Sequence, residues 1–249
     1  MANLARTPRL YVEAPLAGGT SVALSREQTH YVANVMRLKA GDALRLFNGR
    51  DGEWLGRIAT LARRDCAVIC DEPTAEFRQT PDIDYLFAPL KHARLDYMAQ
   101  KATEMGVRRL RPVFTERTVA QRINLERLKA NAIEAAEQCN LLSVPEVLAP
   151  VSFADLLGAW EPKRHLVFCD EAGALADPLA ALDPVPRGAL GLLVGPEGGF
   201  SDLERERLLG LPCVTAISLG PRIMRADTAA VAALALLQAV HGDWADRNA

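Results

Sequence analysis

The residues best suited to chemistry lie in two glycine-proline turns near the end of the chain. The first is Gly195-Pro196-Glu197-Gly198-Gly199, and the second begins at Gly220-Pro221 and carries Arg222, Arg225 and Asp227. Glycine allows the backbone to approach a ligand closely and leaves its N–H groups uncovered. Guanidinium groups stabilise negative charge, and carboxylates accept protons. The pattern predicts a site where bare backbone holds a small molecule while charged side chains act beside it.

Each turn follows a short apolar run that is typical of a buried strand. Leu190 to Val194 is too short for a helix and stops at Gly195, and Val214 to Leu219 is a similar run. Because strand-helix-strand units wind with parallel strands, we predict that these two strands are neighbours. Both turns would then meet beyond the carboxyl ends of the strands, where open α/β sheets bind ligands. The competing interpretation is two ordinary tight turns, since Gly and Pro are common turn residues.

Helices are expected after both turns. Ser201 followed by Glu204 is a capping-box pattern and predicts a helix to about Leu209. A nearly all-apolar helix is predicted from about Thr228 to Val240. Its apolar face would suit a core or a dimer interface equally well.

The two turns carry a family resemblance. Val-Gly-Pro-Glu-Gly-Gly-Phe-Ser (194–201) and Leu-Gly-Pro-Arg-Ile-Met-Arg-Ala-Asp-Thr-Ala (219–229) closely resemble the RsmE family. Members methylate N3 of one uridine in the decoding region of 16S ribosomal RNA with S-adenosylmethionine. They belong to the SPOUT superfamily, whose C-terminal chain threads a trefoil knot that holds the methyl donor. The resemblance implies an α/β fold, with a knotted SPOUT domain and its parallel sheet at 82–249 and a small PUA-like β-barrel at 1–73. It also implies a homodimer.

Further segments match the family, and some depart from it. Lys91 with Gln100 to Val107, and Glu116-Arg117-Thr118, resemble a second family block. Where relatives usually carry Gly-Arg, this chain has Asn140-Leu141. If that arginine contacts RNA or braces the active loop in relatives, another residue must do so here. Asp227 stands where relatives commonly have Glu, and Met224 where they commonly have Leu. Both changes are conservative.

The resemblance implies roles for individual residues. Uracil N3 carries a hydrogen, so the reaction must remove that proton or stabilise the resulting charge on the flanking carbonyls. Thr228 is predicted either to bind the methionine part of the donor or to cap the last helix. The candidates for catalysis are Arg222, Arg225, Asp227 and Glu197, and those for the donor are Val194, Gly195, Gly199, Ile217, Leu219, Gly220, Met224 and Thr228.

The N-terminal part resembles an RNA-binding module. Short strands are predicted at residues 9–13, 21–24, 43–47, 53–61 and 66–70, with one helix capped by Ser25 and ending near Leu38. Residues 1–70 hold ten Lys or Arg against six Asp or Glu, whereas the remainder holds 19 against 25. This asymmetry favours a basic module that binds an anionic partner. A basic surface that is merely solvated would give the same charge distribution. The predicted RNA contacts are Arg9, Arg37, Lys39, Arg45, Arg50 and, after the linker at 73–81, Lys91.

Three aromatic residues in this part have two possible roles. Tyr11, Phe47 and Trp54 would either stack on RNA bases or fill the barrel. A core role is favoured, because a small barrel needs large apolar residues inside.

Composition bounds the remaining possibilities. The 249 residues are 49% hydrophobic and 24% charged, without an apolar run long enough for a membrane span. No signal peptide is evident, so the cytoplasm is the expected location and the five cysteines are expected to be reduced. The four histidines show no ligand spacing, so no metal is expected. Residues 172–188, rich in Ala and Pro, are predicted to wind loosely over the surface.

Two other functions compete with methyl transfer. A nucleotide-dependent dehydrogenase is disfavoured, because residues 195–199 do not form the G-x-G-x-x-G pattern and the next strand does not end in an acidic residue. A non-catalytic RNA-binding ribosome assembly factor is disfavoured because binding RNA does not require paired Gly-Pro turns beside arginines.

Overall fold

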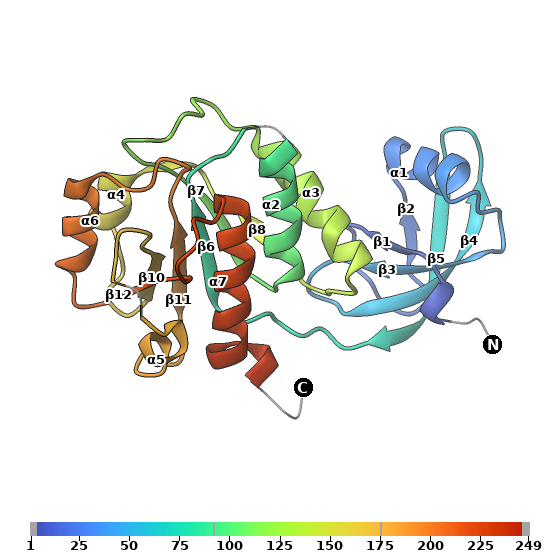
Figure 1. Cartoon of the computed structure of the whole chain (residues 1–249). Coiled ribbons are helices and arrows are strands. Elements are labelled where there is room, and N and C mark those ends of the chain that lie inside the picture. The colour runs from blue at the N-terminus through green and yellow to red at the C-terminus, as the bar shows by residue number, and fades with distance from the viewer. Residues whose placement is uncertain (1–3, 92, 175, 246–249) are drawn as a thin grey trace. The chain divides into compact units, whose positions relative to one another are not determined.

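The computed structural model describes residues 4–91, 93–174 and 176–245, and the chain divides into two compact units (Figure 1). The N-terminal unit contains the chain up to Gln79 together with Ala136–Val144. The C-terminal unit contains Thr80–Ala135 and the chain from Pro145 onward. The sequence had not indicated that residues 136–144 pack with the N-terminal unit.

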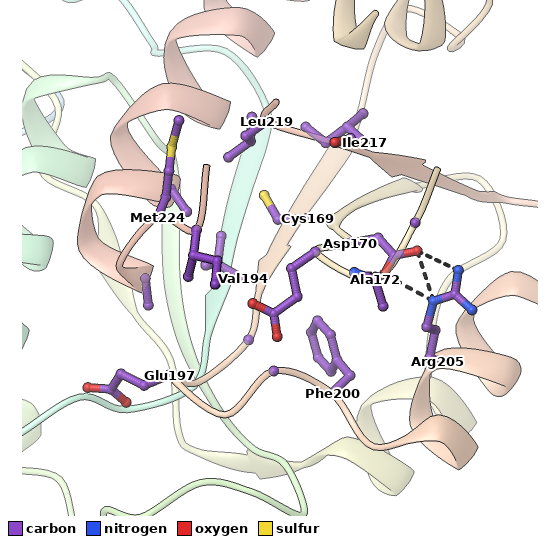
Figure 2. Close-up of a pocket in the computed structure, with 18 of the residues that line it drawn as sticks. Cys169, Asp170, Ala172, Val194, Glu197, Phe200, Arg205, Ile217, Leu219 and Met224 are labelled. Carbon is purple, nitrogen blue, oxygen red and sulfur yellow. Dashed lines mark hydrogen bonds and ion pairs between the residues drawn. The ribbon is translucent and has the colours of Figure 1, made fainter. Parts of the chain in front are cut away.

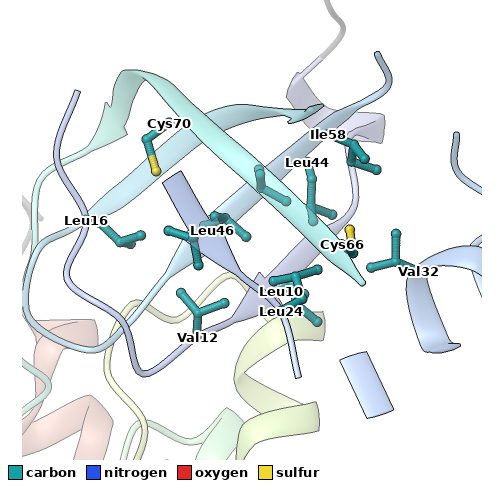
Figure 3. Close-up of a cluster of buried hydrophobic side chains, with 12 residues drawn as sticks. Leu10, Val12, Leu16, Leu24, Val32, Leu44, Leu46, Ile58, Cys66 and Cys70 are labelled. Atoms are coloured by element: carbon teal, nitrogen blue, oxygen red, sulfur yellow. The ribbon is translucent and has the colours of Figure 1, made fainter. Parts of the chain in front are cut away.

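The N-terminal unit is built on a curled five-stranded sheet with the order β1-β3-β4-β5-β2. Its alternating apolar residues point inward and form a core that includes Leu10, Leu44, Leu46 and Ile58 (Figure 3). Strand β5 runs beyond the predicted end at Cys70, into the expected linker. The strands are β1 (Arg9–Tyr11), β2 (Ser21–Ala23), β3 (Ala43–Phe47), β4 (Glu53–Leu61) and β5 (Cys66–Ala75).

The predicted helix of this unit forms in two parts, after a short 3-10 turn at Leu4–Arg6. Helix α1 (Arg26–His30) has the predicted capping box, in which Ser25 and Gln28 each bond the other's backbone. It continues as a π-helical turn over Tyr31–Val35. Arg37 has a φ of 57°, a left-handed conformation that ends the helix before Leu38.

The C-terminal unit contains a parallel sheet with the order β12-β10-β11-β6-β7-β8, and β9 also pairs with β7. The prediction that the strands before the two turns are neighbours is wrong, because β10 lies between β11 and β12 and pairs with both. The strands are β6 (Ile83–Phe87), β7 (Arg109–Phe114), β8 (Glu146–Val147), β9 (Val151–Ser152), β10 (His165–Cys169), β11 (Leu190–Val194) and β12 (Val214–Ile217).

Helices cover both faces of this sheet (Figure 1). Phe168 and Leu193 point to one face, where they pack with Leu208 of α6. On the other face the Tyr85 hydroxyl contacts Met98 of α2, and α7 packs beside α2. The helices are α2 (Ala93–Glu104), α3 (Leu125–Gln138), α4 (Phe153–Gly158), α5 (Pro178–Leu182), α6 (Asp202–Leu209), α7 (Ala226–His241) and the 3-10 turn η3 (Asp243–Ala245).

The segment at 172–188 is more ordered than predicted. Helix α5 forms within it, since Asp177 accepts a hydrogen bond from the Leu179 N–H and Pro178 starts the helix. Leu182 is fully buried. The Ala-rich composition of this segment gave no indication of helix α5.

Candidate functional site

A cavity of about 380 Å³ lies at the carboxyl ends of β10, β11 and β12 (Figure 2). It has the position expected for ligands of α/β sheets and the size of a small-molecule site. The loops after the three strands form most of its wall, and the starts of α6 and α7 complete it. Residues that line it include Cys169, Asp170, Glu171, Val194, Gly195, Glu197, Gly199, Phe200, Ile217, Leu219, Gly220, Arg222 and Met224.

The structure brings most of the predicted donor residues together at this cavity. All of them except Thr228 line it, and so do two predicted catalytic residues, Glu197 and Arg222. Arg225 and Asp227 lie just beyond the lining, where α7 begins. The apolar part of the wall is well buried, since Val194 is 3% exposed and Ile217 is 1% exposed.

The start of α7 contradicts one of the two roles predicted for Thr228, the helix cap, and leaves donor binding a prediction. Arg225 occupies the N-cap position and makes no side-chain capping bond. Thr228 is exposed within the first turn, and its backbone N–H donates to the Asp227 carboxylate at 2.9 Å. Thr228 therefore does not cap the helix. Burial, followed by the charges of Cys169 and Asp227, raises the pKa of Tyr85 well above its usual value of 10.0.

Three glycines in the loops have distinct geometric roles. A Cβ added to Gly195 would lie 3.1 Å from the Phe200 ring, so this position is closely packed. Gly199 has a φ of 67°, and a Cβ there would lie 2.0 Å from a carboxylate oxygen of Glu171. Gly220 has a φ of 97° and no atom within 4 Å of its added Cβ, so the backbone at this turn is open to a ligand.

Two arginines hold the first turn: Arg117 lines the cavity, and Arg94 lies outside its lining. The Arg94 guanidinium lies 3.3 Å from a Glu197 carboxylate oxygen, and Arg117 donates to the Gly198 carbonyl at 2.9 Å. The Glu197 side chain lies at the edge of the site and points away from Cys169 and Phe200 (Figure 2). Its charge is therefore partly compensated before any ligand binds.

The loop after β10 supplies site residues that the sequence did not indicate. Asp170 is buried and forms an ion pair at 2.9 Å with Arg205 of α6, which fastens this loop to the helix (Figure 2). Glu171 follows directly and lines the cavity. The sequence pointed only weakly to these acidic residues as part of the site. They follow β10, and only the tertiary structure places β10 between β11 and β12.

Cys169 offers no nucleophile to the site. Burial raises the pKa of its thiol from 9.0 to about 12, so the thiol stays protonated at neutral pH. Within the described residues, no group of His, Cys, Asp and Glu is arranged to hold a metal ion. The same part of the chain contains no helix long and apolar enough to span a membrane.

The prediction that Arg9 contacts RNA requires correction. Its side chain is 3% exposed and pairs with Glu53 at 2.6 Å. It also donates to the carbonyls of Ala136, Glu137 and Leu141, so it anchors the returning segment of the N-terminal unit. Arg9 is the first residue of β1, and its side chain is buried within the N-terminal unit.

The other predicted RNA contacts differ in exposure. Arg37 and Lys39 are exposed at the end of the helical segment. Arg45 is half-buried and pairs with Glu53, whereas Arg50 is exposed beside Asp51. Arg37 and Lys39 are therefore the best placed of these for a phosphate backbone.

The core role favoured for the aromatic residues of this unit is confirmed for Phe47. Phe47 is fully buried, and the Tyr11 ring meets it edge-on at 5.6 Å between centroids. Trp54 is partly buried against the same core. These three rings are packing residues in this structure.

Lys91 lies in the C-terminal unit, beside a second hollow of about 610 Å³. Arg122 and Arg127 also line the hollow, together with Val119, which is 63% exposed. Arg127 is held by Asp96 at 2.5 Å, whereas Lys91 and Arg122 are exposed. The hollow combines positive charge with apolar surface.

Comparison with known proteins identifies the family. Residues 78–238 match the model of the RNA methyltransferase domain, and residues 24–69 match the RNA methyltransferase PUA domain. The ribosomal RNA small subunit methyltransferase E of Rickettsia conorii is 31% identical, with 91% of this chain and 93% of that protein covered. The protein of the same name from Bacillus subtilis is also 31% identical, over 86% and 88% of the two chains.

Solved structures agree with these sequence matches. The ribosomal RNA small subunit methyltransferase E from Neisseria gonorrhoeae, bound to S-adenosyl methionine, superposes with a TM-score of 0.87 at 27% identity, covering 96% of this chain and all of the other. A methyltransferase from Legionella pneumophila, in complex with SAM, gives 0.86 at 30% identity, with coverages of 96% and 99%. The chain therefore belongs to the RNA methyltransferase family that contains the ribosomal RNA small subunit methyltransferases E.

Proposed function

We propose that this protein methylates N3 of a uridine in the decoding region of 16S ribosomal RNA, with S-adenosylmethionine as the methyl donor. The observation that carries the proposal is the cavity where the loops after β10, β11 and β12 meet. Its glycine backbone and apolar wall suit an adenosine, and the family relatives include proteins solved with this donor.

The residues at the cavity fit the donor. Gly220 leaves open backbone at the turn, and Val194, Ile217 and Met224 supply apolar surface for a neutral purine. Leu219 also lines the cavity. S-adenosylmethionine, when bound, supplies a methyl carbon on a positively charged sulfur, so no metal or covalent enzyme intermediate is required.

The chain must prepare the acceptor nitrogen. Arg222 is exposed at the cavity, and Arg225 is exposed at the start of α7, so both can reach an RNA base presented from solvent. Their guanidinium groups would stabilise negative charge on the uracil carbonyls as the N3 proton leaves. Glu197 and Asp227 are the proposed proton acceptors, although Arg94 holds Glu197 in the unliganded chain.

A separate surface would hold the RNA. N3 lies on the Watson-Crick edge, so the target uridine must be unpaired or splayed out when it reacts. Arg37 and Lys39 of the N-terminal unit, and Lys91 of the C-terminal unit, are exposed cations proposed to contact phosphates.

The family resemblance supports two further proposals. The RNA would be presented within the small ribosomal subunit, which also places the activity in the cytoplasm. The chain would be knotted at the donor site and work as a homodimer. Light scattering coupled to size exclusion tests the dimer, and a monomer at working concentrations would contradict it.

Labelled methyl transfer tests the function directly. Purified small subunits and free 16S ribosomal RNA are incubated with the protein and labelled donor, and the modified base is mapped. We expect label at N3 of one uridine. Donor binding with no transfer to either RNA would favour a non-catalytic assembly factor, and NAD binding without donor binding would favour a dehydrogenase.

A further inference from the structure

We propose that the Glu171 carboxylate is the ionic contact that selects a positively charged methyl donor in the cavity. This inference rests on the proposed function. It concerns a residue on the loop after β10 that neither the turn motifs nor the family resemblance indicated.

The first argument compares the four carboxylates that line the cavity, those of Asp170, Glu171, Glu197 and Asp202. Asp170 is neutralised by Arg205, and Glu197 faces Arg94. Asp202 begins α6, where the helix N-terminus stabilises negative charge, and it lies in the field of Arg205. Among the described residues, Glu171 lines the cavity without an ion pair of its own.

The second argument is the position of that carboxylate. One of its oxygens occupies the space that a Cβ on Gly199 would need, at 2.0 Å from the ideal Cβ position. The carboxylate therefore lies against the glycine-rich turn, with the turn's backbone on one side and the cavity on the other. Although Glu171 is exposed, this close approach leaves no room for a side chain at position 199.

The third argument is the chemistry of the ligand. The donor carries a positive sulfonium and a positive α-ammonium, while its product S-adenosylhomocysteine keeps only the ammonium. Glu171 is exposed and has no ion pair of its own within the described part of the chain, so its carboxylate is available to attract either cation at the cavity wall. If Glu171 faces the sulfonium, it also helps to release the neutral thioether product.

The test measures binding of S-adenosylmethionine and S-adenosylhomocysteine by calorimetry to the wild-type protein and to Glu171→Gln. The substitution keeps the side chain's size and removes its charge. We expect the donor to bind about fivefold more weakly, the upper end of the range for one exposed charge pair. Glu206→Gln, which removes an exposed charge on α6 outside the cavity lining, is the matched control and should bind both ligands as the wild type does.

The two ligands identify which cation is recognised. A loss for S-adenosylmethionine alone assigns the contact to the sulfonium, and an equal loss for both assigns it to the α-ammonium. Unchanged donor affinity in Glu171→Gln, with wild-type protein that binds the donor, overturns this inference and leaves the proposed function standing. Wild-type protein that binds neither ligand overturns both.

Salt dependence provides an independent readout. Raising the ionic strength should weaken donor binding to the wild type more than to Glu171→Gln, because screening acts only where the charge remains. Parallel salt dependences for the two proteins would contradict an ionic role for this carboxylate.

Discussion

At the scale of single residues, the buried ion pair between Arg9 and Glu53 organises the N-terminal unit. Both side chains are almost fully buried, and Arg45 and Thr74 also bond the same carboxylate. Arg9 donates in addition to three carbonyls of the returning segment. Removing one partner would leave an uncompensated buried charge, which costs much more than losing an exposed pair.

Arg9→Ala should therefore destabilise the protein by about 3–5 kcal/mol. The free energy of unfolding is measured by urea titration. The matched control is Arg57→Ala, which removes the exposed pair of Arg57 with Asp71 and should cost less than about 1 kcal/mol. Equal losses of unfolding free energy for the two substitutions would show that the buried pair stabilises the protein no more than the exposed pair does.

The same pair predicts a pH dependence. Burial alone would raise the pKa of Glu53, but hydrogen bonds from Arg9 and Thr74 and the arginine charges lower it below the usual 4.5. A lowered carboxylate pKa contributes stability that is complete above about pH 4.5 and is lost as the pH falls through the folded-state value. The difference in unfolding free energy between wild type and Glu53→Gln should therefore shrink on acidification below pH 4.5. A difference that is independent of pH would contradict this assignment.

Arg225 carries the residue-scale prediction for catalysis. It is exposed at the start of α7 and does not line the donor cavity. Arg225→Ala should therefore keep donor affinity and lower the single-turnover rate of methyl transfer by about 100-fold or more, the scale of losing one charge-stabilising donor. Arg207→Ala, an exposed arginine of α6, is the control. Wild-type turnover in Arg225→Ala would remove this residue from the mechanism.

At the scale of elements, helix α6 begins with a capping box and contacts the loop after β10 at the cavity. Ser201 and Glu204 form the predicted capping box, and Glu204 also accepts the Glu116 N–H at 2.8 Å. The helix then presents Arg205 to Asp170, so the cap supports the loop that carries Glu171. The local sequence therefore determines where α6 begins, whereas the contacts that α6 makes with the site depend on residues far away in the chain.

Ser201→Ala should destabilise the protein by about 1 kcal/mol, because it removes the hydroxyl that accepts the Glu204 N–H. Thermal unfolding followed by circular dichroism measures the change. Ser21→Ala, at an exposed position of β2, should have little effect. The cap would be unimportant if both variants unfolded like the wild type.

At the scale of the whole molecule, the net charge of −2 by itself gives no indication of RNA binding. Residues 1–70 hold ten Lys or Arg against six Asp or Glu and so carry a positive net charge, and after the correction for Arg9 their exposed cations include Arg37 and Lys39. Phosphate contacts release counterions, so the number of contacts sets how steeply affinity falls with salt.

Replacing Arg37 and Lys39 with Ala should weaken binding to 16S ribosomal RNA and reduce the salt slope by about 2. Filter binding across a salt series measures both quantities. The control replaces Lys163 and Arg187, two exposed cations of the C-terminal unit, and removes the same charge. Identical slopes for the two double variants would mean that bulk charge, rather than this surface, governs the affinity.

The sequence alone determined the elements that depend on local forces. The range of β11 and the capping boxes at Ser25 and Ser201 follow from an apolar run and from bonds that span three residues. The resemblance of the two turns similarly located the cavity, because its glycines stand in contiguous motifs.

Only the tertiary structure decided which distant segments meet. The insertion of β10 between β11 and β12 brought Glu171 to the cavity, and the return of residues 136–144 turned Arg9 from an expected RNA contact into a buried anchor. Strand order and burial depend on pairings between residues far apart in the chain, and local periodicity does not encode them.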